Sequence, residues 1–188
     1  MVSLKTASIV FLCVLLSACA SMGDGSTQDK QDKILSMKND VLTQLFQQKP
    51  DSRKVVEGSK GYGVFSNANV NLLVVSAGTG YGVVKNMATQ QHTYMNMAEG
   101  GVGLGMGVKD YRIVMVFHTK QAMDHFVNNG WTFGGNADAA AVASKKGGSI
   151  EGEAYFGDVT VYTFTEAGLA LQATVKGTKF WVDSELNP

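Results

Sequence analysis

The chemically reactive side chains of this chain are few. They are two cysteines, Cys13 and Cys19, and three histidines, His92, His118 and His125. The histidines lack the spacing of metal ligands, so no metal site is expected. The sequence has no Gly-x-Ser-x-Gly elbow, and its glycine runs lack the pattern of nucleotide-binding motifs. We therefore expect a protein that is not an enzyme and needs no cofactor, and the remaining chemistry is that of a cysteine thiol.

Cys19 follows a short apolar segment at the start of the chain. Lys5 supplies a positive charge, and the apolar run over residues 7–16 is about half as long as a membrane-spanning helix. These features predict a secretory signal peptide over residues 1–18. The Leu-Ser-Ala-Cys sequence that ends at Cys19 resembles the lipobox of bacterial lipoproteins, in which the cysteine becomes the first residue and carries acyl chains such as palmitate. The alternative is an ordinary secretory signal in which Cys19 is incidental.

Removal of the signal peptide changes which interactions the chain can use. Cys13 leaves with the signal and Cys19 is occupied by lipid, so no disulfide is expected. Lys5 is removed as well, which leaves 15 basic against 16 acidic side chains. A nearly neutral chain lacks the concentrated basic face of a nucleic-acid-binding protein. The domain must therefore be stabilised by an apolar core.

The residues around Cys19 also predict location and domain organisation. Ala20 occupies the position where, by resemblance to Gram-negative lipoproteins, an Asp would favour the inner membrane. Its presence favours an anchor in the outer membrane, facing the periplasm or the cell surface. Residues 19–28 are rich in small and polar residues and are predicted to be a flexible tether. A single domain is expected over residues 29–188.

Three segments are predicted to be helices. The first ends before Pro50 and has an apolar stripe, with Lys38 among the polar residues off that stripe. A second helical turn is expected over Arg53–Glu57, and a third helix between Thr119 as N-cap and Gly130 as C-cap. The stripe of the first helix consists of Ile34, Leu35, Val41, Leu42, Leu45 and Phe46. We expect this stripe to pack on a sheet, and a helix lying on lipid is the alternative.

Beyond Gly58 the chain is predicted to form many short strands. Val70–Val75 is a continuous apolar run, and Tyr111–Phe117 is rich in β-branched and aromatic residues. A tight hairpin is expected at Lys176–Lys179. The further strand candidates are residues 62–65, 80–85, 93–98, 101–108, 158–165, 169–176 and 179–182. This pattern indicates an α+β fold, with a mainly antiparallel sheet or partly closed barrel of short glycine-rich strands and two to three packed helices.

Glycine recurs at every second residue in several of these strands. Because side chains alternate across a strand, each set of glycines leaves one face of the sheet nearly bare. That space must be filled by the protein's own helix, by tight coiling of the sheet, or by an acyl chain or other apolar ligand. The candidate apolar-ligand face consists of Gly80, Gly82, Gly101, Gly103, Gly105 and Gly107.

Several stretches of the chain share the order and spacing of one known family. They are Lys60–Phe65, Gly78–Gly82, Gly100–Gly107, Tyr111–Phe117, Trp131–Gly135, Ala137–Ala143 and Val161–Gly168. Together they resemble the SYLF domain of lipid-binding proteins, over about residues 30–183. Eukaryotic members are linked to membrane and phosphoinositide binding and some to actin, whereas bacterial members look like envelope lipoproteins. The resemblance implies a lipid-adjacent domain.

Contacts to lipid headgroups would need exposed cations. Lys145 and Lys146 form a basic pair in a predicted glycine loop, and Arg53, Lys54 and Lys60 form a second group. Both groups are candidate headgroup contacts. A solvated surface is the alternative for each, because isolated exposed lysines are common.

Two functions from different classes are consistent with these features. In the first, a membrane-anchored envelope lipoprotein binds a phospholipid or another apolar ligand. In the second, the chain is a structural or interaction protein that docks an envelope protein in the periplasm, and lipid serves only as the tether. Membrane lipid, bound through acylated Cys19, is a partner in both, and nucleic acid is a partner in neither.

Overall fold

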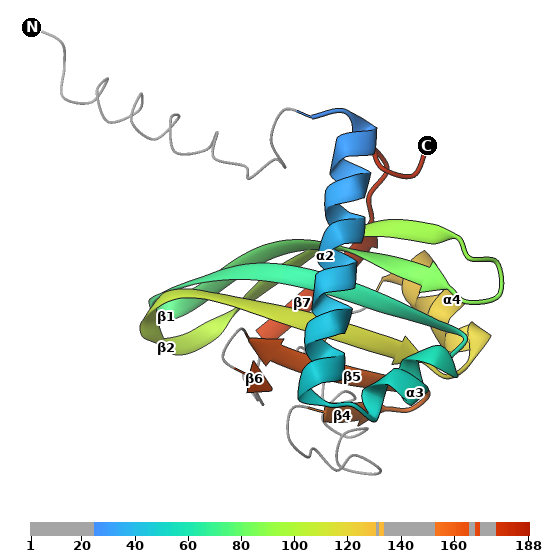
Figure 1. Cartoon of the computed structure of the whole chain (residues 1–188). Coiled ribbons are helices and arrows are strands. Elements are labelled where there is room, and N and C mark those ends of the chain that lie inside the picture. The colour runs from blue at the N-terminus through green and yellow to red at the C-terminus, as the bar shows by residue number, and fades with distance from the viewer. Residues whose placement is uncertain (1–24, 131, 134–152, 166–167, 170–175) are drawn as a thin grey trace, which may run out of the picture.

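The computed structural model describes residues 25–130, 132–133, 153–165, 168–169 and 176–188. In this part of the chain, three helices pack on a curved antiparallel sheet, which confirms the predicted α+β fold (Figure 1). The predicted signal peptide and Cys19 lie outside the described residues, as do Lys145 and Lys146.

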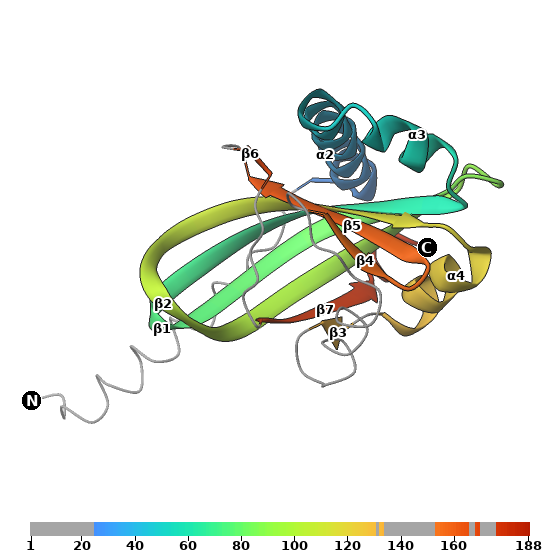
Figure 2. The ribbon, with the colours of Figure 1, turned by 90° about the horizontal axis from the view of Figure 1, so that it is seen from below.

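The sheet is built around two long strands, β1 (Gly61–Asn86) and β2 (His92–Phe117), which form one antiparallel hairpin. Each strand has 26 residues, so the prediction of short strands was wrong. The alternating glycines lie inside these two continuous strands, where the missing side chain permits bending. Figure 2 shows the hairpin curving over at one end of the molecule. β1 therefore has a first arm (residues 61–68) and a second arm (residues 78–86) on either side of the bend.

Shorter strands extend the sheet on both sides of this bend. They are β3 (Thr132–Phe133), β4 (Glu153–Phe156), β5 (Val159–Thr165), β6 (Gly168–Leu169) and β7 (Lys176–Val182). β7 pairs with the beginning of β2 and carries β3, whereas β5 pairs with the end of β2 and carries β4 and β6. The predicted hairpin at Lys176–Lys179 was wrong, because β7 runs through these residues. The described strands form a seven-stranded sheet that curves so that its two halves face each other.

The main apolar core lies between the two halves of the sheet. Phe65 of β1 packs against Phe180 of β7, with ring centroids 4.8 Å apart. α4 (Lys120–Asn129) adds Met123 and Phe126 to the same core. Each of these side chains is at most 3% exposed, and full burial of such a side chain contributes about 1.5–3 kcal/mol.

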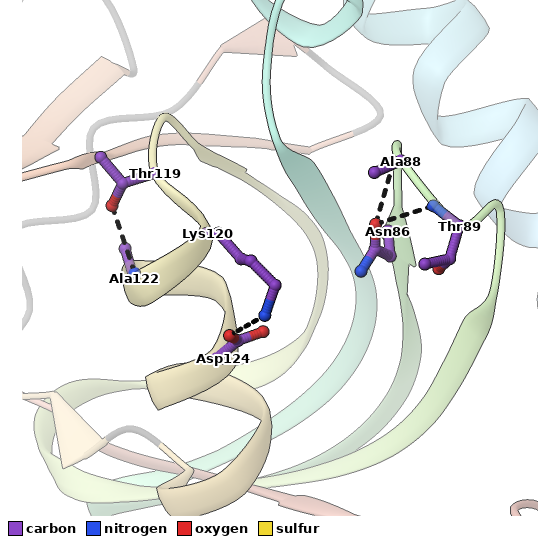
Figure 3. Close-up of polar contacts among 7 residues, drawn as sticks. All are labelled: Asn86, Ala88, Thr89, Thr119, Lys120, Ala122 and Asp124. Carbon is purple, nitrogen blue, oxygen red and sulfur yellow. Dashed lines mark hydrogen bonds and ion pairs between the residues drawn. The ribbon is translucent and has the colours of Figure 1, made fainter.

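The ends of α4 are set by local signals that the sequence already shows. The Thr119 hydroxyl accepts a hydrogen bond from the Ala122 N–H at 3.2 Å (Figure 3), which confirms the predicted N-cap. Gly130 adopts a φ of +65° after the last helical residue, which confirms the predicted C-cap. Lys120 and Asp124 form an ion pair on the exposed side of this helix (Figure 3).

The outer face of the curved sheet is covered by α2 (Thr27–Gln48). Val41 packs in one cluster with Val64 of the first arm of β1, and Ile34 packs in another with Val83 of the second arm. α2 therefore crosses both arms. The prediction that this helix packs on the sheet is confirmed.

The boundaries of α2 differ slightly from those expected. The Ser26 side chain accepts from the Asp29 N–H and Asp29 accepts from the Ser26 N–H, a reciprocal cap that starts the helix at Thr27. Thr27 and Gln28, the last two residues of the tether predicted over residues 19–28, are therefore helical. The chain leaves α2 before Pro50, and α3 (Ser52–Glu57) follows, as predicted.

Close approach of the two arms of β1 is possible because of glycines in the second arm. A Cβ on Gly82 would lie 2.3 Å from Phe65 Cδ1 and from the Val64 carbonyl oxygen. A Cβ on Gly80 would lie 2.3 Å from the Ser66 carbonyl oxygen. At these two positions the side-chain space is filled by the first arm, which agrees with the alternative of a tightly coiled sheet and leaves no room there for an apolar ligand. The remaining glycines of that predicted face lie in β2, where their surroundings fall outside what the structure describes; they are Gly101, Gly103, Gly105 and Gly107.

We predict that Gly82→Ala strongly destabilises the domain. The new methyl group would overlap backbone and a core ring, and overpacking of this kind costs about 3 kcal/mol. Gly100→Ala is the matched control, since a Cβ at Gly100 meets nothing within 4 Å. Urea unfolding measures both. Equal stability of the two variants would contradict the close approach of the arms.

Candidate functional site

A groove runs along one side of α2, over the line where the two arms of β1 meet. It consists of two adjoining hollows of about 440 and 880 Å³. Ser66, Tyr81 and Arg112 line both hollows, so the space is continuous. We call this space the α2 groove. Its larger hollow is also lined by Lys30, Met97, Trp181, Val182 and Leu186.

Arg112 is placed in this groove by the alternation of β2. Val114 and Val116 lie on the same face of the strand and are fully buried beneath the helices. Arg112 is partly buried at the margin of this face, directly opposite Ser66 of β1. In the part of the chain that the structure describes, its guanidinium group has no hydrogen bond or ion pair.

The larger hollow has an apolar rim. Trp181 is 40% exposed and Val182 is 36% exposed, which is unusual for large apolar side chains. The segment after them is held in place by Asp183, whose carboxylate accepts hydrogen bonds from the Asn96 side chain and the Leu186 N–H. The groove therefore combines a partly buried cation with an exposed aromatic rim on a fixed backbone.

The basic residues in and just after α3 line neither hollow of this groove. Arg53, Lys54 and Lys60 are exposed, and Arg53 already contacts the Phe46 ring at 4.2 Å and Glu57 at 3.7 Å. α3 follows the C-terminal end of α2, a helix of 22 residues and therefore about 33 Å long. The larger hollow reaches Lys30 in the first turns of that helix, and the smaller hollow reaches Gln47 near its C-terminal end. Arg53, Lys54 and Lys60 line neither hollow, and they stay candidate headgroup contacts.

The sequence analysis missed Arg112 and Lys30. The signal for Arg112 was present, because it is the charged residue in the apolar run Tyr111–Phe117. Its significance depends on which face it occupies and on whether a described carboxylate pairs with it. Neither can be known before the strands are paired.

A second group of basic side chains lies under α2, beside the turn that joins β1 to β2. Lys85 and His92 are directly opposite each other across the hairpin. The turn is ordered by Asn86, whose side-chain oxygen accepts from the Ala88 and Thr89 N–H groups at 2.9 and 3.1 Å (Figure 3).

Lys38 of α2 belongs to this basic group. It is only 8% exposed, so the prediction that it lies off the packed stripe was wrong. Burial, followed by repulsion from Lys85, lowers the pKa of Lys38 below its ordinary value. Burial and the charges of Lys38 and Lys85 likewise lower the pKa of His92. His92 Nε2 is also buried without a hydrogen-bond partner.

Other kinds of site are not formed by the residues that can be placed. Among them, no three His, Cys, Asp or Glu side chains gather in a group that could hold a metal ion. His118 Nε2 instead lies 2.7 Å from the Thr160 hydroxyl. Within the same residues, every helix is too short or too polar to cross a bilayer.

Comparison with known proteins identifies the family. Residues 98–188 match the family described as Las17-binding protein actin regulator (Ysc84). Beta cell expansion factor A of Aeromonas veronii is 33% identical over 153 residues, or 81% of this chain. The chain belongs to the Ysc84/SYLF family. This confirms the resemblance seen in the sequence. The matched region spans 57% of the length of the Aeromonas relative.

We predict that Lys38→Met stabilises this SYLF domain at pH 7. Methionine fills a similar space without the buried charge, and the expected gain is about 1 kcal/mol. Because the folded-state pKa of Lys38 lies below its unfolded value, the full penalty is present at neutral pH. The penalty is lost as the pH rises through the folded pKa towards 10.5. The gain from methionine, measured by urea unfolding at pH 7 and pH 10, should therefore shrink at the higher pH.

Lys33→Met is the control for this substitution, because Lys33 is exposed on the same helix. It should change stability by less than about 0.5 kcal/mol at either pH. Lys38→Met should also raise the pKa of His92 towards 6.5, because a nearby positive charge is removed. An NMR titration of the His92 ring measures this shift, and an unchanged pKa would contradict the proximity of the two groups.

Proposed function

We propose that this chain is a non-catalytic envelope lipoprotein whose SYLF domain binds a phospholipid or other apolar lipid in the α2 groove. Acylated Cys19 anchors it to the outer membrane. The observation that carries this proposal is the groove itself, with exposed Trp181 and Val182 at its rim. Its larger hollow, about 880 Å³, is within the size range of small-molecule pockets.

The position of the groove supports the same proposal. Seven peptide steps separate Cys19 from the helix cap at Ser26, which limits the distance between them to about 25 Å. Lys30 of the groove lies just beyond this cap, in the first turns of α2. An anchor at Cys19 would keep this end of the domain close to the bilayer, with the α3 cations further away.

The rim side chains also suit a membrane surface. Tryptophan is enriched where membrane meets water, because its ring is apolar and its N–H can bond to water or headgroups. Trp181 and the neighbouring Val182 present such a surface beside the cations Lys30 and Arg112. Attraction to lipid would thus come from a local patch, since the whole chain has a formal net charge of zero.

A protein-docking role is the second candidate. The description of the matched family names a binding protein and actin regulator, and an exposed aromatic rim is also typical of protein interfaces. Native mass spectrometry separates the two candidates. Co-purified lipid supports lipid binding, whereas an empty domain that retains a specific envelope protein supports docking.

We predict that Cys19→Ala releases the protein from the membrane fraction into the soluble periplasm. Loss of the acyl chains removes the anchor, since each buried methylene contributes about 0.8 kcal/mol. Cell fractionation measures the location, and intact-mass analysis of the native protein should show the added acyl groups. An unmodified first residue in the native protein would contradict the lipoprotein assignment.

We predict that the unacylated chain binds phospholipid vesicles through the groove rim. The chain has two tryptophans, so Trp131→Phe leaves Trp181 as the reporter. Vesicles of phosphatidylethanolamine and phosphatidylglycerol should shift its emission to shorter wavelength. Val182→Asp should lower co-sedimentation at least about tenfold, because a charge at the rim opposes insertion. Lys54→Asp, on α3, is the control, and a loss confined to that variant would move the contact to α3.

A further inference from the structure

We propose that Arg112 binds the phosphate group of a phospholipid whose acyl part lies towards Trp181 and Val182. This assignment rests on the proposed function, because it names the chemistry of the ligand that the α2 groove would take. It treats Arg112 as the residue that distinguishes a phosphate ester from a neutral lipid.

The two arginines of the chain have different environments. Arg53 is exposed, with Glu57 at 3.7 Å and the ring of Phe46 at 4.2 Å. Arg112 is partly buried and has no such partner in the described part of the chain. Partial removal of a cation from water without a partner costs free energy, and a bound anion offsets that cost. The planar guanidinium offers paired N–H donors that match two oxygens of a phosphate.

Four other charged residues line the groove, and their environments differ from that of Arg112. Lys30 adds a second cation to the larger hollow. Asp183 also lines it, but its carboxylate already accepts hydrogen bonds from the protein, including that from the Leu186 N–H. Asp40 and Glu185 line the groove from exposed positions, where solvent screens them. The partly buried charges of the groove are therefore Lys30, Arg112 and Asp183, and of these Asp183 is already hydrogen-bonded within the protein.

The apolar half of the site points to a lipid and not to a free ion. Trp181, Val182 and Leu186 line the same hollow as Arg112. A phosphate held at Arg112 would leave Trp181 and Val182 exposed unless the ligand also carried an acyl part. The phosphate group is common to phospholipids and to soluble phosphate compounds, and the groove favours the former because its rim is apolar.

Binding to phosphatidic acid and to diacylglycerol with the same acyl chains tests this proposal. These lipids differ only in the phosphate. The protein is the chain from residue 19 onward with Cys19→Ser, which keeps every described residue, and with Trp131→Phe so that Trp181 reports binding. Arg112→Met should weaken phosphatidic acid binding at least about tenfold. It should leave diacylglycerol binding unchanged, so that the two lipids bind this variant equally.

Two further variants serve as controls. Arg112→Lys keeps the charge but loses the paired donors, so its affinity for phosphatidic acid should fall between those of the native chain and Arg112→Met. Lys120→Met should bind both lipids as the native chain does, because Lys120 is exposed on α4, pairs with Asp124 and lines neither hollow. A thermal unfolding scan of each variant confirms that the domain is folded.

The outcomes distinguish this proposal from the proposed function. Equal binding of phosphatidic acid by the native chain and Arg112→Met would overturn the role of Arg112 and leave lipid binding intact. Failure of the native chain to bind either lipid would overturn lipid binding itself. Inorganic phosphate is the third probe, and binding as tight as that of phosphatidic acid would overturn the lipid part of the assignment.

Discussion

The close approach of the two arms of β1 is the constraint on which the rest of the structure depends. Laid out straight, a strand of 26 residues would extend about 85 Å and neither face would be buried. Curved over, the strand brings Phe65 against Phe180 on the inside. On the outside it aligns Val64 and Val83 as a platform for α2. One steric condition, the absence of a Cβ at Gly82, thus supports the core and the floor of the groove together.

The features that sequence analysis predicted correctly are those with local causes. Thr119 and Gly130 cap α4 because each acts on the adjacent turn of backbone. Pro50 separates α2 from α3 for a similarly local reason. The predicted strands were much shorter than β1 and β2. A glycine-rich stretch is compatible both with a turn between two short strands and with a bend inside one long strand. Only the pairing of residues far apart in the chain distinguishes these two structures.

The groove was harder to predict, because its lining depends on which face of a strand or helix each side chain occupies. Phe180 and Trp181 are neighbours in β7, and the pairing of β7 with β2 decides which of them is buried. Arg112 likewise shares one face of β2 with the buried Val114 and Val116, and strand pairing decides which face that is. Lys38 looks polar on a helical projection, yet it is buried because α2 crosses both arms of the hairpin. The family resemblance indicated lipid, and the residues that would contact it required the three-dimensional arrangement.

Partly or fully buried basic side chains on both sides of α2, at Arg112 and at Lys38, connect these observations. The near-neutral composition conceals them, because acidic residues elsewhere balance the total. Burial lowers the pKa values of Lys38 and His92 below their ordinary values. A ligand that binds the folded state stabilises it in proportion to the logarithm of its concentration. If Cys19 is anchored as proposed, a bilayer of phosphate esters lies within reach of the groove at all times. Arg112, which has no partner among the described residues, would then cost the domain stability only when it is away from the membrane.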